Sequence, residues 1–134
     1  MILPIQYDSG KMMEIALAIS QTIVKGTALQ WNGGYLEIGT TGSTDIRFVA
    51  MQDVTTDGSS HTKILCVPVE GVRFEADCDA VASIADIGTY CQLATGATLN
   101  PDDSTVDCFL IDEIVGTAEV STKVKGRFVH ALGN

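Results

Sequence analysis

The side chains with the strongest potential for chemistry are four cysteines, and their spacing favours packing over reaction. They are Cys66, Cys78, Cys91 and Cys108. No two of them form the C-x-x-C pair that is typical of zinc sites and redox centres. Three of them lie inside apolar runs, such as Ile64-Leu65-Cys66-Val67. We therefore interpret them as reduced thiols packed like small hydrophobic residues, with a disulfide or a metal or catalytic role as the alternatives.

The carboxylates form three short clusters whose spacing suits surface charge better than catalysis. They are Asp77/Asp79, Asp102/Asp103/Asp107 and Asp112/Glu113. The second cluster follows Pro101 in a predicted turn, and it lacks the spacing and the closing Glu of an EF-hand calcium site. The third has the composition of a general acid–base pair, although charged residues at a strand end are usually solvated. We predict no metal site, no cofactor and no catalytic residue.

Motifs of several large enzyme classes are absent from the sequence. It contains no G-x-x-x-x-G-K-[ST] phosphate loop, no G-x-G-x-x-G dinucleotide loop, no G-x-S-x-G elbow and no H-E-x-x-H pair. His61 and His130 are far apart in the chain, and nothing next to either one indicates pairing with a cysteine. The sequence therefore predicts a protein that is not an enzyme.

Two groups of residues have the character of binding residues instead. Lys123, Lys125 and Arg127 alternate along one strand-like segment, so they share a face. They cover a solvated outer face or contact an acidic partner. Trp31 and Tyr35 flank a predicted turn, where they form either a cross-strand aromatic pair or an interface anchor.

The charge balance limits the classes of partner. A net charge of −9, from 8 basic and 17 acidic residues, argues against binding to nucleic acid or to an anionic membrane. No apolar stretch reaches the roughly 20 residues of a membrane span. Residues 1–10 lack the basic and apolar regions of a signal peptide, so we expect the chain to fold in the cytosol.

Short runs rich in Val, Ile, Thr, Phe and Tyr, separated by Gly and Asn/Asp turns, predict an all-β fold. Asn32-Gly33-Gly34 has the composition of a tight hairpin turn. Pro68 predicts an edge position or a bulge for its strand, because proline cannot donate a ladder hydrogen bond. The predicted strands are 27–31, 35–39, 46–52, 63–69, 72–76, 89–93, 106–115 and 122–132.

The remaining segments complete the predicted organisation. Residues 11–22 fit a strand better than a helix, and residues 77–87 fit a loop with at most one short helical turn. At 134 residues, the chain has the length of one domain. We predict a small single-domain β-barrel or sandwich over 15–134, preceded by an extended N-terminal arm over 1–14 without a core-like pattern.

The sequence also contains a faint internal repeat. Gly26-Thr27-Ala28-Leu29-Gln30 is similar to Gly88-Thr89-Tyr90-Cys91-Gln92. At nearly the same offset, residues 43–49 are similar to residues 104–110. Two matches at nearly one offset indicate a duplicated β-unit within one barrel, with chance similarity between short strands as the alternative.

A series of strand starts and turn glycines runs through the chain in a recognisable order. Its segments are Ser20-Gln21-Thr22, 25–29, Tyr35-Leu36, Phe48-Val49-Ala50, Val67-Pro68-Val69-Glu70, 86–93 and 124–132. In this order the chain resembles the small β-rich head decoration, or cement, proteins of tailed bacteriophages. The resemblance spans residues 20–132 and rests on strand starts, such as those at Gly26 and Gly88, rather than on a chemical signature.

The resemblance implies a non-enzymatic structural protein of the virion. Such a protein binds the outer surface of the expanded icosahedral capsid and stabilises the shell, after assembly in the host cytoplasm. Its partners are the major capsid protein and other copies of itself, with a trimer favoured, and it makes no direct contact with nucleic acid or membrane. The contact residues that we expect are the arm residues Leu3, Pro4, Ile5 and Tyr7, the hairpin residues Trp31 and Tyr35, and the basic residues Lys123, Lys125 and Arg127.

Three other functions are compatible with the same residues. The first is another virion β-module, such as a tail-tube, head-completion or receptor-binding part. The second is a small β-type enzyme in which the fold brings Cys66, His61 and a carboxylate together. The third is a small binding module, for example for carbohydrate, with Trp31 and Tyr35 as its contacts.

Overall fold

The computed structural model describes residues 1–129, and in them thirteen β-strands and two single-turn 3₁₀ helices make up the fold. The strands up to residue 68 are β1 (Ile2–Gln6), β2 (Met13–Ala16), β3 (Thr22–Ile23), β4 (Ala28–Asn32), β5 (Tyr35–Ile38), β6 (Phe48–Ala50), β7 (Val54–Thr55) and β8 (Lys63–Pro68). Those that follow are β9 (Arg73–Asp77), β10 (Tyr90–Thr95), β11 (Thr98–Asn100), β12 (Phe109–Ile114) and β13 (Lys123–Phe128). The 3₁₀ turns are η1 (Ser9–Lys11) and η2 (Ile84–Asp86). The predicted all-β class is confirmed.

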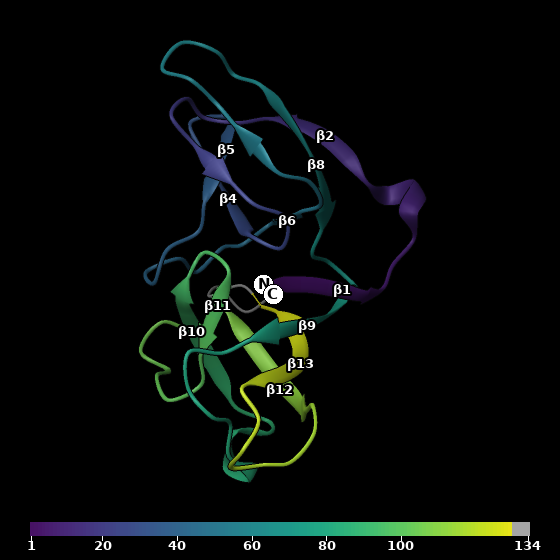
Figure 1. The fold of residues 1–134 in the computed structure, drawn as a ribbon, viewed down its shortest axis with the longest axis vertical. Coiled ribbons are helices and arrows are strands. Elements are labelled where there is room, and N and C mark those ends of the chain that lie inside the picture. The colour runs from purple at the N-terminus through teal and green to yellow at the C-terminus, as the bar shows by residue number, and fades with distance from the viewer. Residues whose placement is uncertain (130–134) are drawn as a thin grey trace.

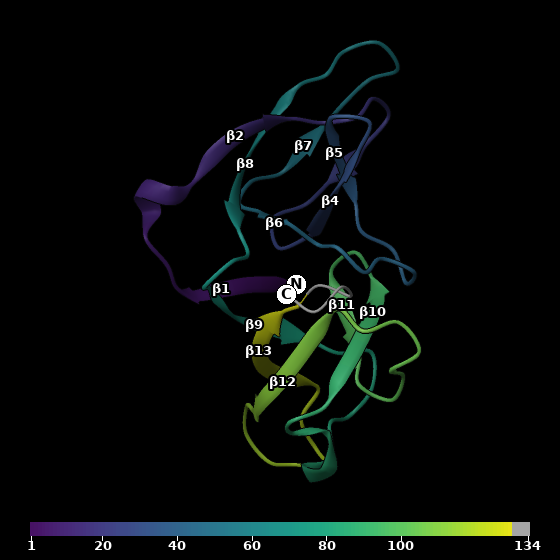
Figure 2. The same ribbon diagram turned by 180° about the vertical axis from the view of Figure 1, so that it is seen from behind.

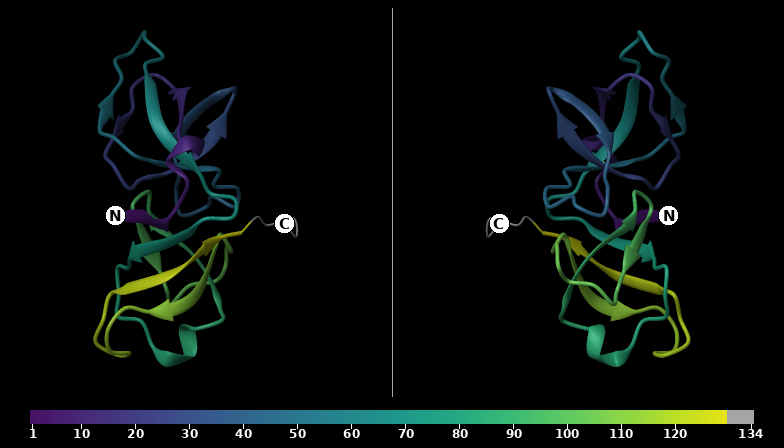
Figure 3. Two further views of the ribbon diagram at one scale, coloured as in Figure 1. Left: turned by 90° about the vertical axis from the view of Figure 1, so that its right-hand side faces the viewer. Right: turned by 90° about the vertical axis from the view of Figure 1, so that its left-hand side faces the viewer.

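Two antiparallel sheets, one above the other in Figure 1, contain most of the strands. The lower sheet has six strands in the order β1-β9-β13-β12-β10-β11, and the upper sheet has five in the order β2-β8-β6-β4-β5. Strands β3 and β7 form a small third sheet. Figure 2 shows the same arrangement from behind, and Figure 3 shows it from the two sides.

Each large sheet curls back on itself, but neither closes into a barrel. In the five-stranded sheet, Leu17 forms an isolated bridge with Leu36 of β5. In the six-stranded sheet, Cys78 forms the corresponding bridge with Leu99 of β11. Each bridge is a single residue pair rather than a ladder of hydrogen bonds. The predicted single barrel is therefore replaced by two open, curled sheets.

The larger hydrophobic core joins the two sheets. Ala28, Val49 and Val67 from the five-stranded sheet are buried in the same cluster as Phe74 and Phe109 of the six-stranded sheet. A second cluster lies within the five-stranded sheet, and its members include Leu17, Leu29, Leu36 and Ile64. Because the larger core draws residues from both sheets, burial of apolar surface stabilises the sheets together.

The two sheets share one connectivity, and this establishes a structural repeat. Strands β2, β8, β6, β4 and β5 correspond in order to β9, β13, β12, β10 and β11. The register is also kept: Met13 opposes Cys66 in one sheet, and Phe74 opposes Gly126 in the other. We call the segments that form these two five-stranded units repeat 1 (residues 13–69) and repeat 2 (residues 74–129).

Individual hydrogen bonds recur in both repeats. Gly26 N donates to Ala50 O over 2.8 Å, and Gly88 N donates to Ile111 O over 2.7 Å. Both glycines have a positive φ, of 88° and 84°, which favours glycine over residues with a Cβ. The repeat predicted from the sequence is thus confirmed as a duplicated β-unit. Its placement within one barrel was wrong, because each copy forms a sheet of its own.

The predicted N-terminal arm is extended, but its first half belongs to the six-stranded sheet. Strand β1 pairs antiparallel with β9, and Ile2 is fully buried in the larger core. The expectation of no core-like pattern was therefore wrong, because a single buried residue in an alternating segment leaves almost no signal. The predicted boundary between residues 14 and 15 falls inside β2.

The prediction that Pro68 marks an edge strand or a bulge was also wrong, since β8 pairs on both sides without a register shift. Strand β8 lies between β2 and β6. Pro68 is its last residue, opposite Phe48 and beyond the Met13–Cys66 pair where β2 begins. Proline is compatible with this position because its missing N–H would face the β2 side, and β2 begins only opposite Cys66. The last predicted strand is β13, and the part of that prediction over 130–132 lies outside the described residues.

Candidate interaction surfaces

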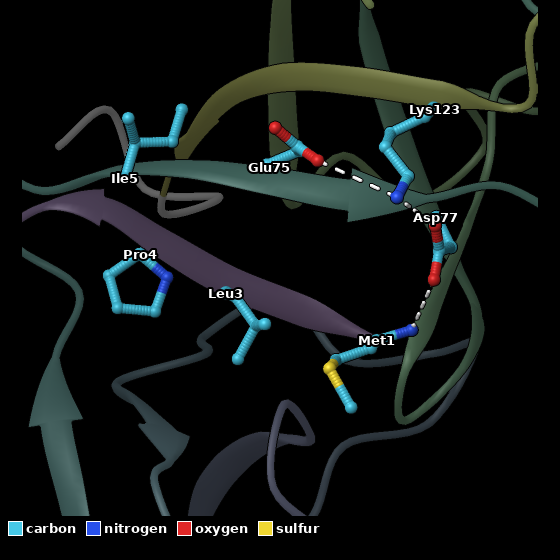
Figure 4. Close-up of a pocket in the computed structure, with 7 residues that line it drawn as sticks. All are labelled: Met1, Leu3, Pro4, Ile5, Glu75, Asp77 and Lys123. Carbon is cyan, nitrogen blue, oxygen red and sulfur yellow. Dashed lines mark hydrogen bonds and ion pairs between the residues drawn. The ribbon is translucent and has the colours of Figure 1, made fainter.

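The predicted arm contacts lie beside a shallow concavity at the edge of the six-stranded sheet. Leu3, Pro4 and Ile5 of β1 line it, and charged side chains of β9 and β13, namely Glu75, Asp77 and Lys123, form its other side (Figure 4). Ile5 and Tyr7 are 37% and 40% exposed. The backbone of β1 is fixed in the sheet and holds Leu3, Pro4 and Ile5 in place, so binding them costs little conformational entropy. Tyr7 follows the end of β1 and does not line the concavity.

Ion pairs cover the charged side of this concavity. Lys123 Nζ lies 3.6 Å from Glu75 and 3.6 Å from Asp77. The ammonium group of Met1 lies 2.9 Å from Asp77, and this contact is the main cause that lowers the pKa of the Asp77 carboxyl. The concavity thus combines an apolar wall with neutralised charges (Figure 4).

Trp31 is exposed at the surface of the other sheet. It is 47% exposed, and its ring meets Phe48 edge to face with the centroids 5.6 Å apart. Arg47 and Glu70 lie beside it in a concavity of about 400 Å³. An exposed indole against a fixed aromatic neighbour has the geometry of an interface anchor.

Tyr35 lies on the opposite face of the same hairpin. Trp31 pairs with Leu36, and Tyr35 pairs with Asn32, so successive side chains place the two aromatics on different faces. Tyr35 instead stacks on His61, with ring centroids 3.7 Å apart. The cross-strand pair of Trp31 with Tyr35, one of the two predicted roles, is therefore not formed. Tyr35 is one residue away from Leu36, the partner of Trp31, and so points to the other face.

The basic residues of β13 share one face, as their alternation predicts, but two of the three are in ion pairs. Lys123 has the two partners described above, and Lys125 Nζ lies 3.5 Å from Glu113. Arg127 has no ion pair among residues 1–129, and it lines a depression with Glu70 and Tyr90. A stripe of free positive charge is thus reduced to one guanidinium group, because β9 and β12 bring carboxylates to both sides of β13.

One cluster of this face was missed in the sequence. Arg73 forms hydrogen bonds with the carboxylates of Asp112 and Glu113. The Arg73 guanidinium, followed by the positive charge of Lys125, lowers the pKa of Glu113. Asp112 and Glu113 are thereby solvated, ion-paired surface charges. Arg73 and Asp112 are 39 residues apart in the chain, so no local signal linked them.

A second missed feature lies at the end of the six-stranded sheet, where two loops meet. Glu119 N donates to Ala82 O over 2.8 Å, and the Glu119 carboxylate accepts from Ile84 N over 3.1 Å. These loops carry four exposed aliphatic side chains, namely Val81, Ile84, Ile87 and Val120. Single exposed aliphatic residues are common on protein surfaces, so their types alone do not indicate that these four lie together.

The cysteines are buried, as predicted, and all four are free thiols. Burial raises the pKa of Cys66 to about 12, and it also raises the pKa of the other three. A thiol that stays protonated is a poor nucleophile and a poor metal ligand. The disulfide alternative is not realised in this structure.

Two carboxylates in the loops accept hydrogen bonds from backbone N–H groups. The Asp57 carboxylate accepts from Ser59 N and Ser60 N, and these bonds lower its pKa. Asp103 accepts from Thr105 N in the same way. Within residues 1–129, no group of three or more His, Cys, Asp or Glu side chains is arranged to hold a metal ion.

The predicted contact residues are thus distributed over both sheets. The β1 residues and Lys123 share one concavity, whereas Trp31 lies on the other sheet near Arg47. No helix in the described part of the chain is long and apolar enough to span a membrane. The chain matches no protein-family model and no curated protein, so its function has to be argued from this geometry.

Proposed function

We propose that this chain is a non-enzymatic structural protein of a bacteriophage virion, which binds the outer surface of the icosahedral capsid and stabilises the shell. The major capsid protein is its principal partner. Other copies of the chain are neighbours in a homo-oligomer, with a trimer favoured. The sequence resemblance to head decoration proteins supplies the capsid as the partner.

The observation that carries the proposal is that apolar side chains suited to contacts are exposed, whereas the potentially reactive thiols are buried. Ile5 and Trp31 are exposed on strands and Tyr7 directly after β1, whereas the thiols are buried. The pairing of β13 charges with carboxylates also fits a partner surface of mixed charge better than a polyanion. Surfaces of this kind support binding by shape and apolar contact.

Binding only to the expanded shell would stabilise that shell by mass action, because a ligand of one state shifts the equilibrium toward that state. Many weakly held copies then add up to a large effect on the particle. Rigid sheets suit this role, since little ordering entropy is lost when a surface is fixed before binding.

Co-sedimentation with expanded, undecorated capsids tests the proposal. We expect saturable pelleting at a fixed ratio to the capsid subunit. Trp31→Ala and Tyr7→Ala should weaken it, whereas Val24→Ala, at an exposed apolar residue outside the predicted contacts, should not.

Light scattering of the protein alone separates the alternatives. A trimer that pellets with capsids supports the proposal. A hexameric ring that does not pellet would move the assignment to a tail tube. A monomer without pelleting would overturn the virion assignment and favour a small binding module.

A further inference from the structure

The outer edge of β2 is an open sheet edge in the described part of the chain. Strand β2 is the first of its sheet and pairs with β8 over Met13–Ala16, and the sheet approaches it on the other side only where Leu17 bridges β5. Figures 1 and 2 show β2 at the periphery of the molecule. Its counterpart in repeat 2, β9, has β13 on one side and β1 on the other. The duplication thus presents the same edge twice, once covered and once uncovered.

A hydrogen bond that occurs in both repeats shows which backbone groups of β2 face β8 and which face outward. Leu17 N donates to Thr62 O over 2.9 Å, and the counterpart Cys78 N donates to Thr122 O over 2.7 Å. Backbone N–H groups point alternately to the two sides of a strand. The N–H of Ala16, one residue earlier, therefore points away from β8.

In repeat 2 the equivalent group is used. Asp77 N, the counterpart of Ala16 N, donates to Met1 O over 3.1 Å, and Glu75 pairs with Leu3 of β1. Glu14 is the counterpart of Glu75. The N–H groups of Glu14 and Ala16 thus face the side where repeat 2 has β1. On that side repeat 1 has only the single bridge of Leu17 to β5, and repeat 2 has the equivalent bridge at Cys78 in addition to β1.

Side chains are also more buried on β9, which β1 covers, than on β2. Phe74 and Ala76 of β9 are fully buried. Their counterparts Met13 and Ile15 are less buried, and Met13 is 45% exposed. An exposed edge with apolar side chains is a site for strand pairing.

The other edge of the five-stranded sheet is already covered. Ala18 N donates to Leu36 O over 2.8 Å. Ile38 N donates to Gln21 Oε1 over 3.2 Å. Residues 18–21 thus cover β5, which leaves β2 as the edge open to an incoming strand.

We propose that the β2 edge binds an extended segment of another polypeptide by β-strand addition, antiparallel to β2. The chemistry of that segment is indicated by β1, in which Ile2 opposes Ala76 and Pro4 opposes Phe74. Apolar side chains two residues apart cover the partner strand in the same way, and the main chain supplies the hydrogen bonds. This inference rests on the duplication and holds whether or not the partner is a capsid.

A peptide with the sequence of residues 1–7 is the probe, because it contains the strand that covers the equivalent edge. Hydrogen exchange of the full chain reads out the individual amides. Without peptide, the amides of Glu14 and Ala16 should exchange fast and the amide of Asp77 slowly, since only the last has a partner strand. With peptide, we expect at least tenfold slower exchange at Glu14 and Ala16 and a Kd below about 1 mM.

Two substitutions at one position separate backbone pairing from side-chain effects. Ala16→Pro removes the N–H that points away from β8. Ala16→Val keeps this N–H and adds a side chain similar in size to that of proline. The proline variant should bind the peptide at least tenfold more weakly, and the valine variant should bind it as the unsubstituted chain does. The exchange measurement on the unsubstituted chain decides the question even if the proline variant does not fold.

Three results would overturn the inference. One is unchanged exchange at Glu14 and Ala16 with millimolar peptide. Another is equal peptide binding by Ala16→Pro and Ala16→Val. The third is a dimer in sedimentation that protects these amides without peptide, because the occupant would then be a second copy of the chain.

Discussion

Alkaline pH should unfold this protein through its buried thiols. The folded state holds all four cysteines protonated, with a pKa of about 12 for Cys66, Cys78 and Cys108 against an ordinary value of 9.0. The unfolded chain releases these protons near pH 9. The free energy of unfolding therefore keeps its full value below about pH 9 and falls as the pH rises from 9 toward 12.

The size of the effect follows from the difference in proton binding. At pH 10, an unfolded thiol with a pKa of 9.0 is mostly thiolate, which favours the unfolded state by about 1.4 kcal/mol relative to pH 7. If all four thiols behave alike, the sum is about 6 kcal/mol. This is comparable with the whole stability of a typical domain, about 5–15 kcal/mol.

Urea titrations followed by circular dichroism, at half-unit steps from pH 7 to 10.5 with a reducing agent, measure this loss. Cys66→Ala is the informative variant, since it removes one thiol and leaves the others. Its free energy of unfolding should start lower, because a cavity is created, and should fall less steeply above pH 9 by up to about 1.4 kcal/mol per pH unit.

Equal slopes for the variant and the unsubstituted chain would refute the reasoning. So would rapid reaction of the native thiols with a disulfide reagent at pH 8. Either result would mean that the thiols titrate in the folded state.

Three further predictions concern packing and charge. Gly126→Ala should lower the free energy of unfolding by about 1–3 kcal/mol or more in urea titrations, because its Cβ would overlap the carbonyl oxygen of Leu110. Ile2→Ala should cost about 2–5 kcal/mol in the same assay, and an effect near zero would show that β1 is not packed as described. Arg73→Ala should raise the pKa of Glu113 toward its ordinary value in an NMR titration. Stability should then depend less on pH as the pH falls below 4.5, because the bonded carboxylate contributes only when ionised, and an unchanged Glu113 titration would contradict the assignment.

Much of the strand pattern was predictable because short β-branched runs and turn glycines are local signals. The hairpin at Gly33 and Gly34, both with positive φ, is the clearest case. The repeat was visible at its glycines, Gly26 and Gly88, where the backbone conformation restricts the residue type. Sheet order was not predictable, since pairing joins residues that are far apart, as β1 and β9 are.

The candidate surfaces were predictable only in part, because exposure and ion pairing depend on neighbouring strands. Alternation placed Lys123, Lys125 and Arg127 on one face. It could not reveal that Glu75, Asp77 and Glu113 neutralise two of them. Trp31 and Tyr35 flank one turn, which predicts a shared site, but the register places them on different faces of the hairpin.

The pairing of β1 with β9 has a consequence for synthesis on the ribosome. Ile2 opposes Ala76, so β1 has no partner until more than half of the described chain has been made. At roughly 5–20 residues per second, that wait lasts several seconds. Repeat 1 contains every strand of its own sheet and can form within this interval. Strand β1 is thus placed late, after repeat 1, and a nascent chain exposes it to neighbouring polypeptides for that time.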